Sequence, residues 1–368
     1  MRAAPLLALM LAACTPPGDT GAPADSGVDT GDSGQAPATA TVLSLNLHCL
    51  RLDGTEFSTN EERFDVVAEV VAAEGVGLIA LQELCEREGE SASALLLAAL
   101  EARTGAAWSL QAAFAHVGWE GTENEADEYV GLAARGELAA ARAIAFGVQE
   151  GLTRVAVQGR WESSLGPLNV TSVHLDNASA SARRGQGRQA AVEGLVGEGS
   201  PASLILGDMN AQPGSDVIED ILGMGYRDLA AALGDDRIDH VLAHRGAPVA
   251  VAAARRVFTG AEEPVVSDHP GVLVRIEAAE AEEVTLTRLV TDADAALGHF
   301  LAVRGDAAPL SWDLGWPAAN PEGRWVAAFS EIPSGSFEYK WLRDDVDWQQ
   351  GENEVGTAGE ESSAEPGF

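Results

Sequence analysis

The chain has 368 residues, which is enough for two globular units with tails. Its 57 acidic residues outnumber 23 basic ones, so the formal net charge is -34, and its one lysine is Lys340. This balance excludes an extended basic nucleic-acid surface and makes nucleic acid a less favoured partner, although a cationic pocket or a bound divalent metal still accepts a phosphate group.

The first residues are typical of an export signal. Residues 1–14 contain one arginine, a short apolar run and small residues before Cys14, and the run is too short for a stable transmembrane helix. The motif LAAC resembles the lipobox of bacterial lipoproteins, which implies cleavage before Cys14 and lipidation of its sulfur. The alternative is a plain secretory peptide with an incidental cysteine. We expect an exported protein anchored by lipid to the bacterial cell envelope, at the outer membrane or cell surface, with no other membrane contact.

Residues 15–40 have the composition of a disordered linker. They are rich in Gly, Pro, Asp, Thr and Ser and contain almost no large apolar side chain. Such a segment cannot bury enough apolar surface to offset its ordering entropy. It therefore reads as a flexible tether between the anchor and the folded part.

From Thr41 onward, apolar runs alternate with helical patterns. Helices are predicted over 62–74, ending at Gly75, and over 91–105, with Ser91 at the start and Gly105 at the end. Strands are predicted over 41–50, 76–85, 154–162, 168–176, 202–210, 238–244 and 271–277. This interleaving indicates an α/β fold, in which ligand sites form beyond strand ends.

A second unit is predicted after residue 276. Residues 277–283, EAAEAEE, form a short acidic linker, and residues 284–359 carry five of the eight tryptophans between Pro, Gly and Asn turns. That pattern favours a small all-β module. Residues 360–368 are expected to be a frayed tail.

Polar side chains gather where the predicted strands of the first unit stop. Each one taken singly has an ordinary explanation as a cap, a turn residue or a surface charge. Together they form an ordered set: Asn46, Glu83, His174, Asp208, Asn210, Asp239, Asp268 and His269.

This ordered set resembles the endonuclease/exonuclease/phosphatase family of metal-dependent phosphoesterases over residues 41–276. The resemblance rests on Asn, Glu, His, Gly-Asp-x-Asn, Ile-Asp and Ser-Asp-His motifs in that family's order. It implies an α/β four-layer sandwich with two packed mixed β-sheets and the active site at one edge. It also implies Mg²⁺ or Mn²⁺ as the cofactor.

By the same resemblance, Glu83 is the principal metal ligand, and Asn46 and Asp268 complete the polar shell. These oxygen donors suit a hard divalent ion. Asp208 is expected to orient or deprotonate the attacking water, and Asn210 to hold the water and the phosphate.

The histidines take the remaining roles that the resemblance implies. His269 contacts the phosphate and is held by Asp239, which also favours the imidazolium. His174 stabilises the charge that develops on the pentacovalent centre. Arg154 is a weaker candidate for a phosphate-binding residue, and His48 departs from the pattern because nuclease members often carry Asp there.

Two cysteines flank the motifs. Cys49 lies three residues after Asn46 and Cys85 two after Glu83. If Asn46 and Glu83 meet at one metal, as the resemblance implies, the two sulfurs lie side by side and form a disulfide in an exported protein. The alternative is two unconnected buried thiols.

The C-terminal module resembles starch-binding carbohydrate-binding modules, which are small β-sandwiches. The match rests on the motifs PLSWD, FEYKW and DWQQGEN. The resemblance implies sugar stacking on Trp312 and Trp348 with a hydrogen bond to Lys340, and hence a polysaccharide partner; packing in the module's core is the alternative for both tryptophans. Core positions are expected for Trp316, Trp325 and Trp341.

The leading interpretation is an exported, metal-dependent phosphoesterase that hydrolyses a phosphodiester or phosphomonoester by in-line attack of water. A phospholipid headgroup or another small phosphorylated molecule is the favoured substrate, since the acidic surface opposes long nucleic acids. The alternatives are an extracellular nuclease of the same family and a non-catalytic surface lipoprotein that binds glycans. Residues 182–188, ARRGQGR, offer either a local phosphate track or, as we favour, a solvated loop and helix start.

Overall fold

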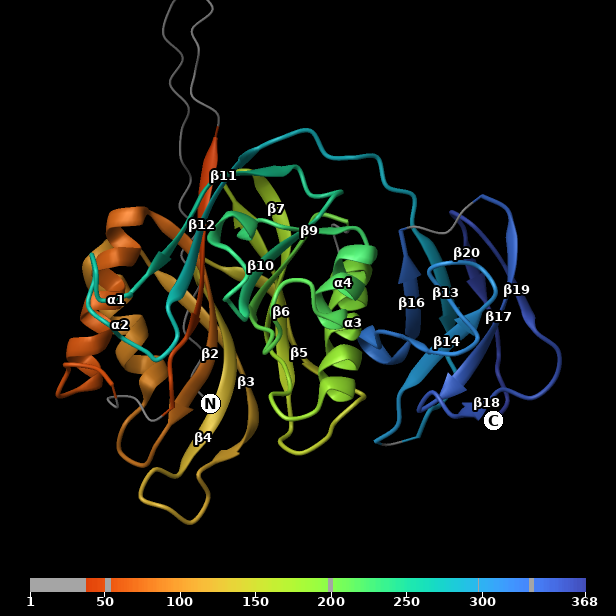
Figure 1. Ribbon diagram of the computed structural model, residues 1–368, viewed down its shortest axis with the longest axis horizontal. Coiled ribbons are helices and arrows are strands. Elements are labelled where there is room, and N and C mark those ends of the chain that lie inside the picture. Colours follow the sequence, from red (N-terminus) through yellow and green to blue (C-terminus); the bar gives the residue numbers. More distant parts are fainter. Residues whose placement is uncertain (1–37, 50–53, 198–200, 297, 331–333) are drawn as a thin grey trace, which may run out of the picture. The chain divides into compact units, whose positions relative to one another are not determined.

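The computed structural model describes residues 38–49, 54–197, 201–296, 298–330 and 334–368 (Figure 1). These residues form one unit by their mutual contacts. The predicted signal peptide, Cys14 and nearly all of the predicted linker 15–40 lie outside the described residues, although Thr39 and Ala40 at its end already belong to the first strand. Among the residues described, no helix is both long enough and apolar enough to cross a bilayer.

The first sheet has six strands and carries two helices on its outer face. In spatial order its strands are β11 (Val249–Val257), β12 (Gly271–Ala278), β1 (Thr39–Asn46), β2 (Val76–Glu86), β4 (Ala126–Arg135) and β3 (Trp108–Gly118). Its helices are α1 (Asn60–Glu74) and α2 (Ala92–Thr104). The β1 and β2 strands run parallel, so the ends of both strands meet at one edge of the sheet.

The second sheet also has six strands. Its order is β5 (Leu138–Ala145), β6 (Val155–Ser163), β7 (Gly166–His174), β8 (Ser203–Asp208), β10 (Asp239–His244) and β9 (Tyr226–Asp228). Its outer face carries α3 (Ala180–Val196) and α4 (Asp216–Gly223), and a short 3-10 turn spans Ala231–Leu233.

Both predicted helices form; α2 has the predicted ends, and α1 ends as predicted but begins at Asn60. The Ser91 side chain accepts a hydrogen bond from the backbone N–H of Ala94, which satisfies one of the free donors of the first turn. Gly75 and Gly105 end their helices in the left-handed conformation, with φ of 62° and 64°. The seven predicted strands of this unit are all present, with ends shifted by a few residues.

The two sheets pack face to face through a buried apolar layer. That layer takes side chains from both sheets, for example Val42 and Leu78 from the first and Val170 and Leu206 from the second. A second apolar layer joins α1 and α2 to the first sheet. The helix, sheet, sheet, helix order confirms the predicted four-layer α/β sandwich.

The chain after residue 284 forms the additional all-β sheets. One sheet has the order β16 (Trp325–Phe329), β13 (Thr287–Thr291) and β20 (Glu361–Ser363). The other contains β15 (Trp316–Pro317), β14 (Leu301–Gly305), β17 (Ser336–Arg343), β18 (Asp347–Trp348) and β19 (Glu354–Thr357), with a 3-10 turn at Pro321–Gly323.

The predicted tail, residues 360–368, is ordered instead of frayed. Its β20 strand pairs in parallel with β13, and the backbone N–H of Ala364 donates to the carbonyl of Val290. A strand at a sheet edge is held by backbone hydrogen bonds, so it needs no apolar pattern that the sequence could reveal.

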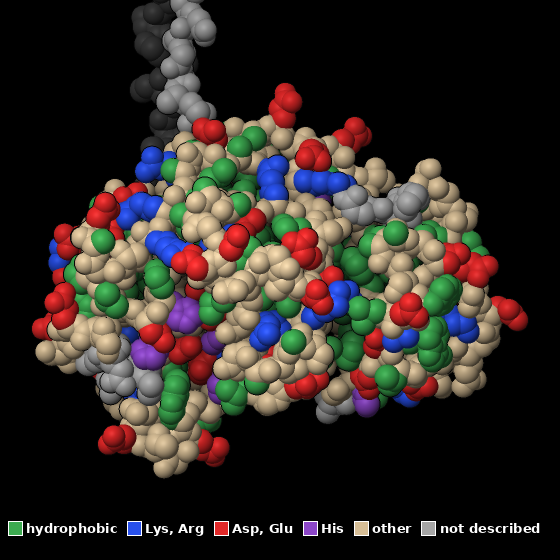
Figure 2. Space-filling model, in the orientation of Figure 1, with side chains coloured by type: hydrophobic (Ala, Val, Ile, Leu, Met, Phe, Trp, Pro, Cys, Tyr) green, Lys and Arg blue, Asp and Glu red, His purple; other side chains and the backbone are tan. Residues whose placement is uncertain are grey.

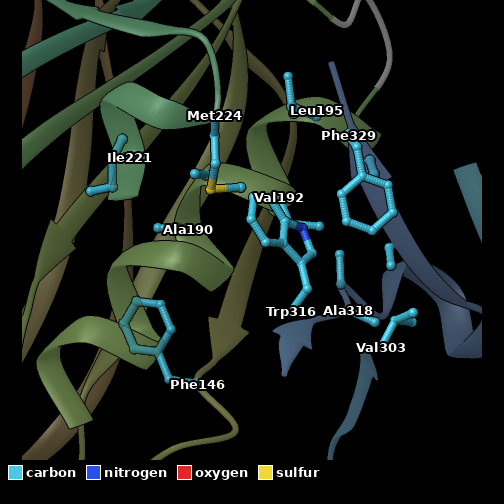
Figure 3. Close-up of a cluster of buried hydrophobic side chains, with 14 of the residues drawn as sticks. Phe146, Ala190, Val192, Leu195, Ile221, Met224, Val303, Trp316, Ala318 and Phe329 are labelled. Carbon is cyan, nitrogen blue, oxygen red and sulfur yellow. The ribbon is translucent and has the colours of Figure 1, made fainter. Parts of the chain in front are cut away.

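The module packs directly on α3 of the α/β sandwich. Figure 3 shows Trp316 and Phe329 from the module against Val192 and Met224, and these residues belong to one continuous buried cluster. The Trp316 and Phe329 rings lie 5.1 Å apart. The expected core positions of the module tryptophans are confirmed, since the exposed fractions are 7% for Trp316, 8% for Trp325 and 0% for Trp341.

We expect Trp316→Ala to lower the free energy of unfolding by about 3–5 kcal/mol, because it empties a packed position shared by the module and α3. Equilibrium guanidinium chloride unfolding measures the change. The matched control is Trp348→Ala, whose side chain is 40% exposed, so its cost should stay below about 1 kcal/mol. Equal losses in both variants would contradict the shared core.

Candidate active site

The predicted catalytic residues meet because neighbouring strands end together. In the second sheet, His174 of β7 is the register partner of Asp208 of β8, and Asp239 of β10 faces Asp208 from the other side. Three of the predicted site residues therefore lie on adjacent strands at one edge. This is the edge at which β1 and β2 of the first sheet also deliver Asn46 and Glu83.

Gly207, in the motif LGDMN, allows β7 and β8 to come together just before Asp208. Its φ is 145°, and a Cβ there would lie 2.0 Å from the carbonyl oxygen of Val173. No residue with a side chain fits that contact. Asp208 then takes a buried position, and its Oδ1 accepts a hydrogen bond of 2.8 Å from the backbone N–H of Asn210.

The Asn46 amide joins the two sheets at the site. Its Nδ2 donates to Glu83 Oε1 at 3.1 Å and to Asp208 Oδ2 at 3.2 Å. Its Oδ1 accepts the backbone N–H of His48 at 2.9 Å. Asn46 is fully buried, so every one of these polar groups needs its partner.

Glu83 is turned into the site by an irregular strand. Its φ is 48°, and the pairing of β2 with β4 changes register between Leu81 and Leu84. Such a bulge re-aims one side chain without breaking the sheet. Glu83 Oε2 accepts the backbone N–H of Cys49 at 2.9 Å.

Cys49 and Cys85 form the predicted disulfide, with a Cα–Cα distance of 5.4 Å. The bond links Cys49, just after β1, to Cys85 in β2, two residues after Glu83. Both cysteines are buried, beside Ala126 of the β3–β4 hairpin. The disulfide therefore covalently joins the two segments that carry Asn46 and Glu83.

His269 is bound to Asp239, with 2.8 Å between Nδ1 and Asp239 Oδ2. Burial alone would lower the pKa of His269, but the Asp239 hydrogen bond and nearby carboxylates outweigh it and raise that pKa to about 9. The imidazolium is therefore the form present at neutral pH. Burial is also the largest influence on Asp208, and it raises the pKa of that carboxyl.

His48 and Asp268 form a second pair, with 3.1 Å between Nδ1 and Oδ1. The hydrogen bond raises the pKa of His48 and lowers that of Asp268. The residue that departs from the nuclease pattern thus faces one of the predicted metal ligands.

Glu128 is a site residue that the sequence reasoning missed. Its Oε1 lies 3.3 Å from His174 Nδ1 and 3.3 Å from Arg154 Nη1, and its Oε2 lies 3.3 Å from His116 Nε2. Burial would raise the pKa of Glu128, yet hydrogen bonds from His116 and His174 hold it well below its usual value. The Glu128 carboxylate thus holds the Nδ1 side of the His174 ring. The other ring nitrogen, Nε2, lies 3.6 Å from Asp208 Oδ2.

The stretch 116–130 is the tip of a hairpin, in which β3 continues to Gly118 and β4 begins at Ala126. Arg154, the weaker phosphate-binding candidate, is 2% exposed and its Nη1 lies 3.1 Å from His174 Nδ1.

These groups line an open pocket of about 470 Å³. Figure 2 shows the hollow, where purple histidines surround recessed red acidic side chains. Glu83, Asp268, His174, Asp208, Asn210, His269 and Arg154 all line it, whereas Asn46 and Asp239 lie directly behind them. Exposed Val117, Trp119 and Leu152 form an apolar rim.

The donor set fits a hard divalent cation. Glu83 and Asp268 bring carboxylate oxygens to the pocket, and Asp239 Oδ1 is a buried oxygen without a hydrogen-bond partner. Asn46 presents its amide nitrogen to the carboxylates, so this geometry supports a positioning role for Asn46 more than direct ligation. Asp208, Asp239 and His269 also bring ligand atoms within 4.8 Å of one another.

Comparison with known proteins agrees with this arrangement. The profile of the Endonuclease/Exonuclease/phosphatase family matches residues 43–269. The chain belongs to the endonuclease/exonuclease/phosphatase family, whose members are hydrolases of phosphoester bonds. The resemblance inferred from the ordered motifs is thereby confirmed for this part of the chain.

Solved structures share the fold at low identity. A family protein from Leptotrichia buccalis C-1013-b is 18% identical with a TM-score of 0.54, over 65% of this chain and 99% of that one. One from Beutenbergia cavernae DSM 12333 is 15% identical with a TM-score of 0.51, over 86% and 99%. The human nocturnin catalytic domain is 18% identical with a TM-score of 0.50, over 66% and 95%. No curated protein matches the chain.

We expect the double variant Cys49→Ala/Cys85→Ala to lose about 3–4 kcal/mol of stability, because the bond closes a loop with a sequence separation of 36. Guanidinium chloride unfolding of the chain without residues 1–14 measures it. Wild-type protein in reducing agent should match the variant. Two titratable thiols in unreduced, unfolded wild type would contradict the bond.

Proposed function

We propose that this chain is an exported, lipid-anchored phosphoesterase that hydrolyses a small phosphodiester or phosphomonoester by in-line attack of water. One observation carries the proposal. A buried carboxylate, Asp208, stands within one pocket between an imidazolium, His269, and a carboxylate-held histidine, His174. That arrangement supplies a base and two groups that stabilise negative charge around one phosphorus atom.

Asp208 is the general base in this proposal. Its raised pKa makes it a better proton acceptor than a solvent-exposed carboxylate. It removes a proton from water as the water oxygen bonds to phosphorus and the bond to the leaving oxygen breaks. Asn210, held through its Nδ2 donation to the carbonyl of Leu175 at 2.9 Å, orients the water and a phosphoryl oxygen.

The histidines stabilise the charge that develops during this displacement. His269 carries a positive charge at neutral pH because Asp239 holds it, so it binds a phosphoryl oxygen. His174, held by Glu128 through Nδ1, directs its Nε2 toward Asp208 and stabilises the charge on the pentacovalent phosphorus. Preorganised donors of this kind need no reorientation during the reaction.

A divalent cation, Mg²⁺ or Mn²⁺, belongs to this proposal because the family generally uses one and the oxygen donors fit it. Glu83 would be its principal ligand, with Asp268 as a further one, while Asn46 holds Glu83 in position. When bound, the ion neutralises phosphoryl charge.

Small substrates are favoured over long nucleic acids. The net charge is -34, and the arginine stretch 182–188 is part of α3. Arg184 and Arg188 both donate to Asp220 of α4, at 2.5 and 2.7 Å. Their charge is already neutralised within the protein, which supports a phospholipid headgroup or a similar small phosphate ester.

Asp208→Asn should lower kcat by about 10²–10⁴, the usual contribution of a general base, with no loss of fold. Phosphate or headgroup release from sphingomyelin, phosphoinositides, sugar phosphates, plasmid DNA and RNA measures activity and substrate together. EDTA should abolish the reaction and Mg²⁺ restore it. The control is Asp65→Asn, a half-exposed carboxylate on α1. Full activity in Asp208→Asn would contradict the role of Asp208 as general base. Activity confined to DNA or RNA would favour the nuclease alternative.

The C-terminal module is proposed to bind a polysaccharide. Trp312 and Trp348 lie with ring centroids 6.2 Å apart at 31°, and Trp348 is 40% exposed. Lys340 Nζ donates to the carbonyls of Gln349 and Gly351 beside Trp348. Two tilted indoles with a nearby ammonium group suit the apolar face and polar rim of a sugar ring.

Trp348→Ala should weaken binding to maltoheptaose or insoluble starch at least about tenfold, since a stacking surface is lost. Calorimetry and starch sedimentation measure it. Trp119→Ala, an equally exposed tryptophan at the catalytic pocket, should leave binding unchanged. If wild type shows glycan binding but no hydrolysis of any phosphate ester, the non-catalytic glycan-binding alternative replaces the enzyme.

A further inference from the structure

A second cavity lies between the catalytic unit and the module. Its volume is about 650 Å³, larger than that of the catalytic pocket. Its apolar walls come from both parts of the chain: Val148, Val217, Phe300, Ala302, Leu314 and Pro317. A mostly apolar cavity of this size is typical of a small-molecule site.

Two loops connect this cavity with the catalytic pocket. The loop after β7 places Asn177 in the catalytic pocket and Ala180 in the cavity. The loop after β8 does the same, because Asn210 borders both spaces and Gln212 borders the cavity. Since β7 and β8 are adjacent and parallel, the two loops lie side by side. The catalytic pocket and the cavity therefore meet at Asn210.

Most charged groups of the cavity form ion pairs within the protein. Arg184 is bound by Asp220, and Arg183 Nη1 donates to the carbonyl of Asp176 at 2.7 Å. Asp345 accepts from Arg304 at 2.7 Å and from the backbone N–H of Gly315 at 3.0 Å. The free energy of binding here would come mainly from apolar contact. Leu314, 41% exposed at the cavity, is the kind of apolar surface that a ligand would cover.

We propose that this cavity binds a single apolar chain of the phosphorylated substrate, while the phosphate group lies in the catalytic pocket. The proposal rests on the proposed phosphoesterase function and narrows its substrate to phosphate esters of single-chain amphiphiles. The module then has a second role, because Leu314 and Pro317 make it one wall of the substrate site.

Calorimetric binding of methylphosphonate and octylphosphonate, in Mg²⁺, tests this proposal. Their carbon–phosphorus bond resists phosphoester hydrolysis, so binding is measured without turnover. Octylphosphonate should bind at least about tenfold more tightly than methylphosphonate to the wild-type protein, because its additional methylene groups leave water.

Two variants test whether the alkyl chain of octylphosphonate lies in the cavity. Leu314→Glu places a charge at the module wall, and Ala180→Trp fills space from the exposed start of α3. Both should remove the chain-length gain and leave methylphosphonate binding unchanged. Val355→Glu, at a 63% exposed position on β19 outside the cavity lining, should keep the gain. Circular dichroism and thermal unfolding establish that each variant folds.

Equal binding of the two phosphonates, or a gain that survives both cavity variants, would overturn the inference and leave the proposed function standing. Tighter binding of glucose 6-phosphate than of octylphosphonate would replace the apolar chain with a sugar. If methylphosphonate does not bind at all, the proposed function fails instead. Octan-1-ol then tests the cavity alone: binding that Leu314→Glu removes supports the apolar site, and no binding overturns it.

Discussion

The candidate site depends on the buried amide of Asn46, which bridges the two sheets of the sandwich. Its nitrogen donates to Glu83 on the first sheet and to Asp208 on the second. Two carboxylates that approach one another repel, and burial disfavours their charged forms. The Asn46 amide donates to both carboxylates, so it offsets their repulsion and the cost of burying them while it fixes their separation. Loss of this amide would leave Glu83 and Asp208 close together without the group that holds their spacing.

The surroundings of the site restrain its parts from several sides. The Cys49–Cys85 bond joins the segments before and after Glu83, and the Cys49 N–H itself holds the Glu83 carboxylate. Beside the disulfide, Glu128 on β4 fixes His174 and Arg154. A covalent link and a buried ionic cluster therefore limit how far the pocket can rearrange. Such restraint suits a reaction that depends on preorganised charge more than on closure of a lid.

Much of the fold and of the site could be predicted, because local signals were strong. Gly75, Ser91 and Gly105 mark helix ends by their own conformational or capping chemistry, and the LGDMN motif places polar residues just after an apolar strand. The order of such motifs was enough to indicate the family and the disulfide.

What could not be predicted depends on contacts distant in sequence. Glu128 acquires a role only because β4 pairs with β2 and β3 with irregular register, which brings it beneath His174. The β20 strand forms because an edge of β13 is available. Trp316 was expected in the core of the module, but its partners on α3 lie more than a hundred residues away. A local pattern specifies that a side chain is buried; it does not specify against what.

The acidity of the chain and its proposed chemistry are compatible because the site's positive charge is local. Lysine is absent from the catalytic unit, and the cationic groups at the pocket include His269 and Arg154, each held by a carboxylate. Such groups neutralise one phosphate group at short range. They do not extend into a basic surface that would follow a polymer backbone, since interactions between exposed charges beyond about 8 Å are largely screened at physiological salt. Because the positive charge is confined to the pocket, the rest of the binding free energy has to come from apolar contacts. The exposed rim residues Trp119 and Leu152 offer such contacts.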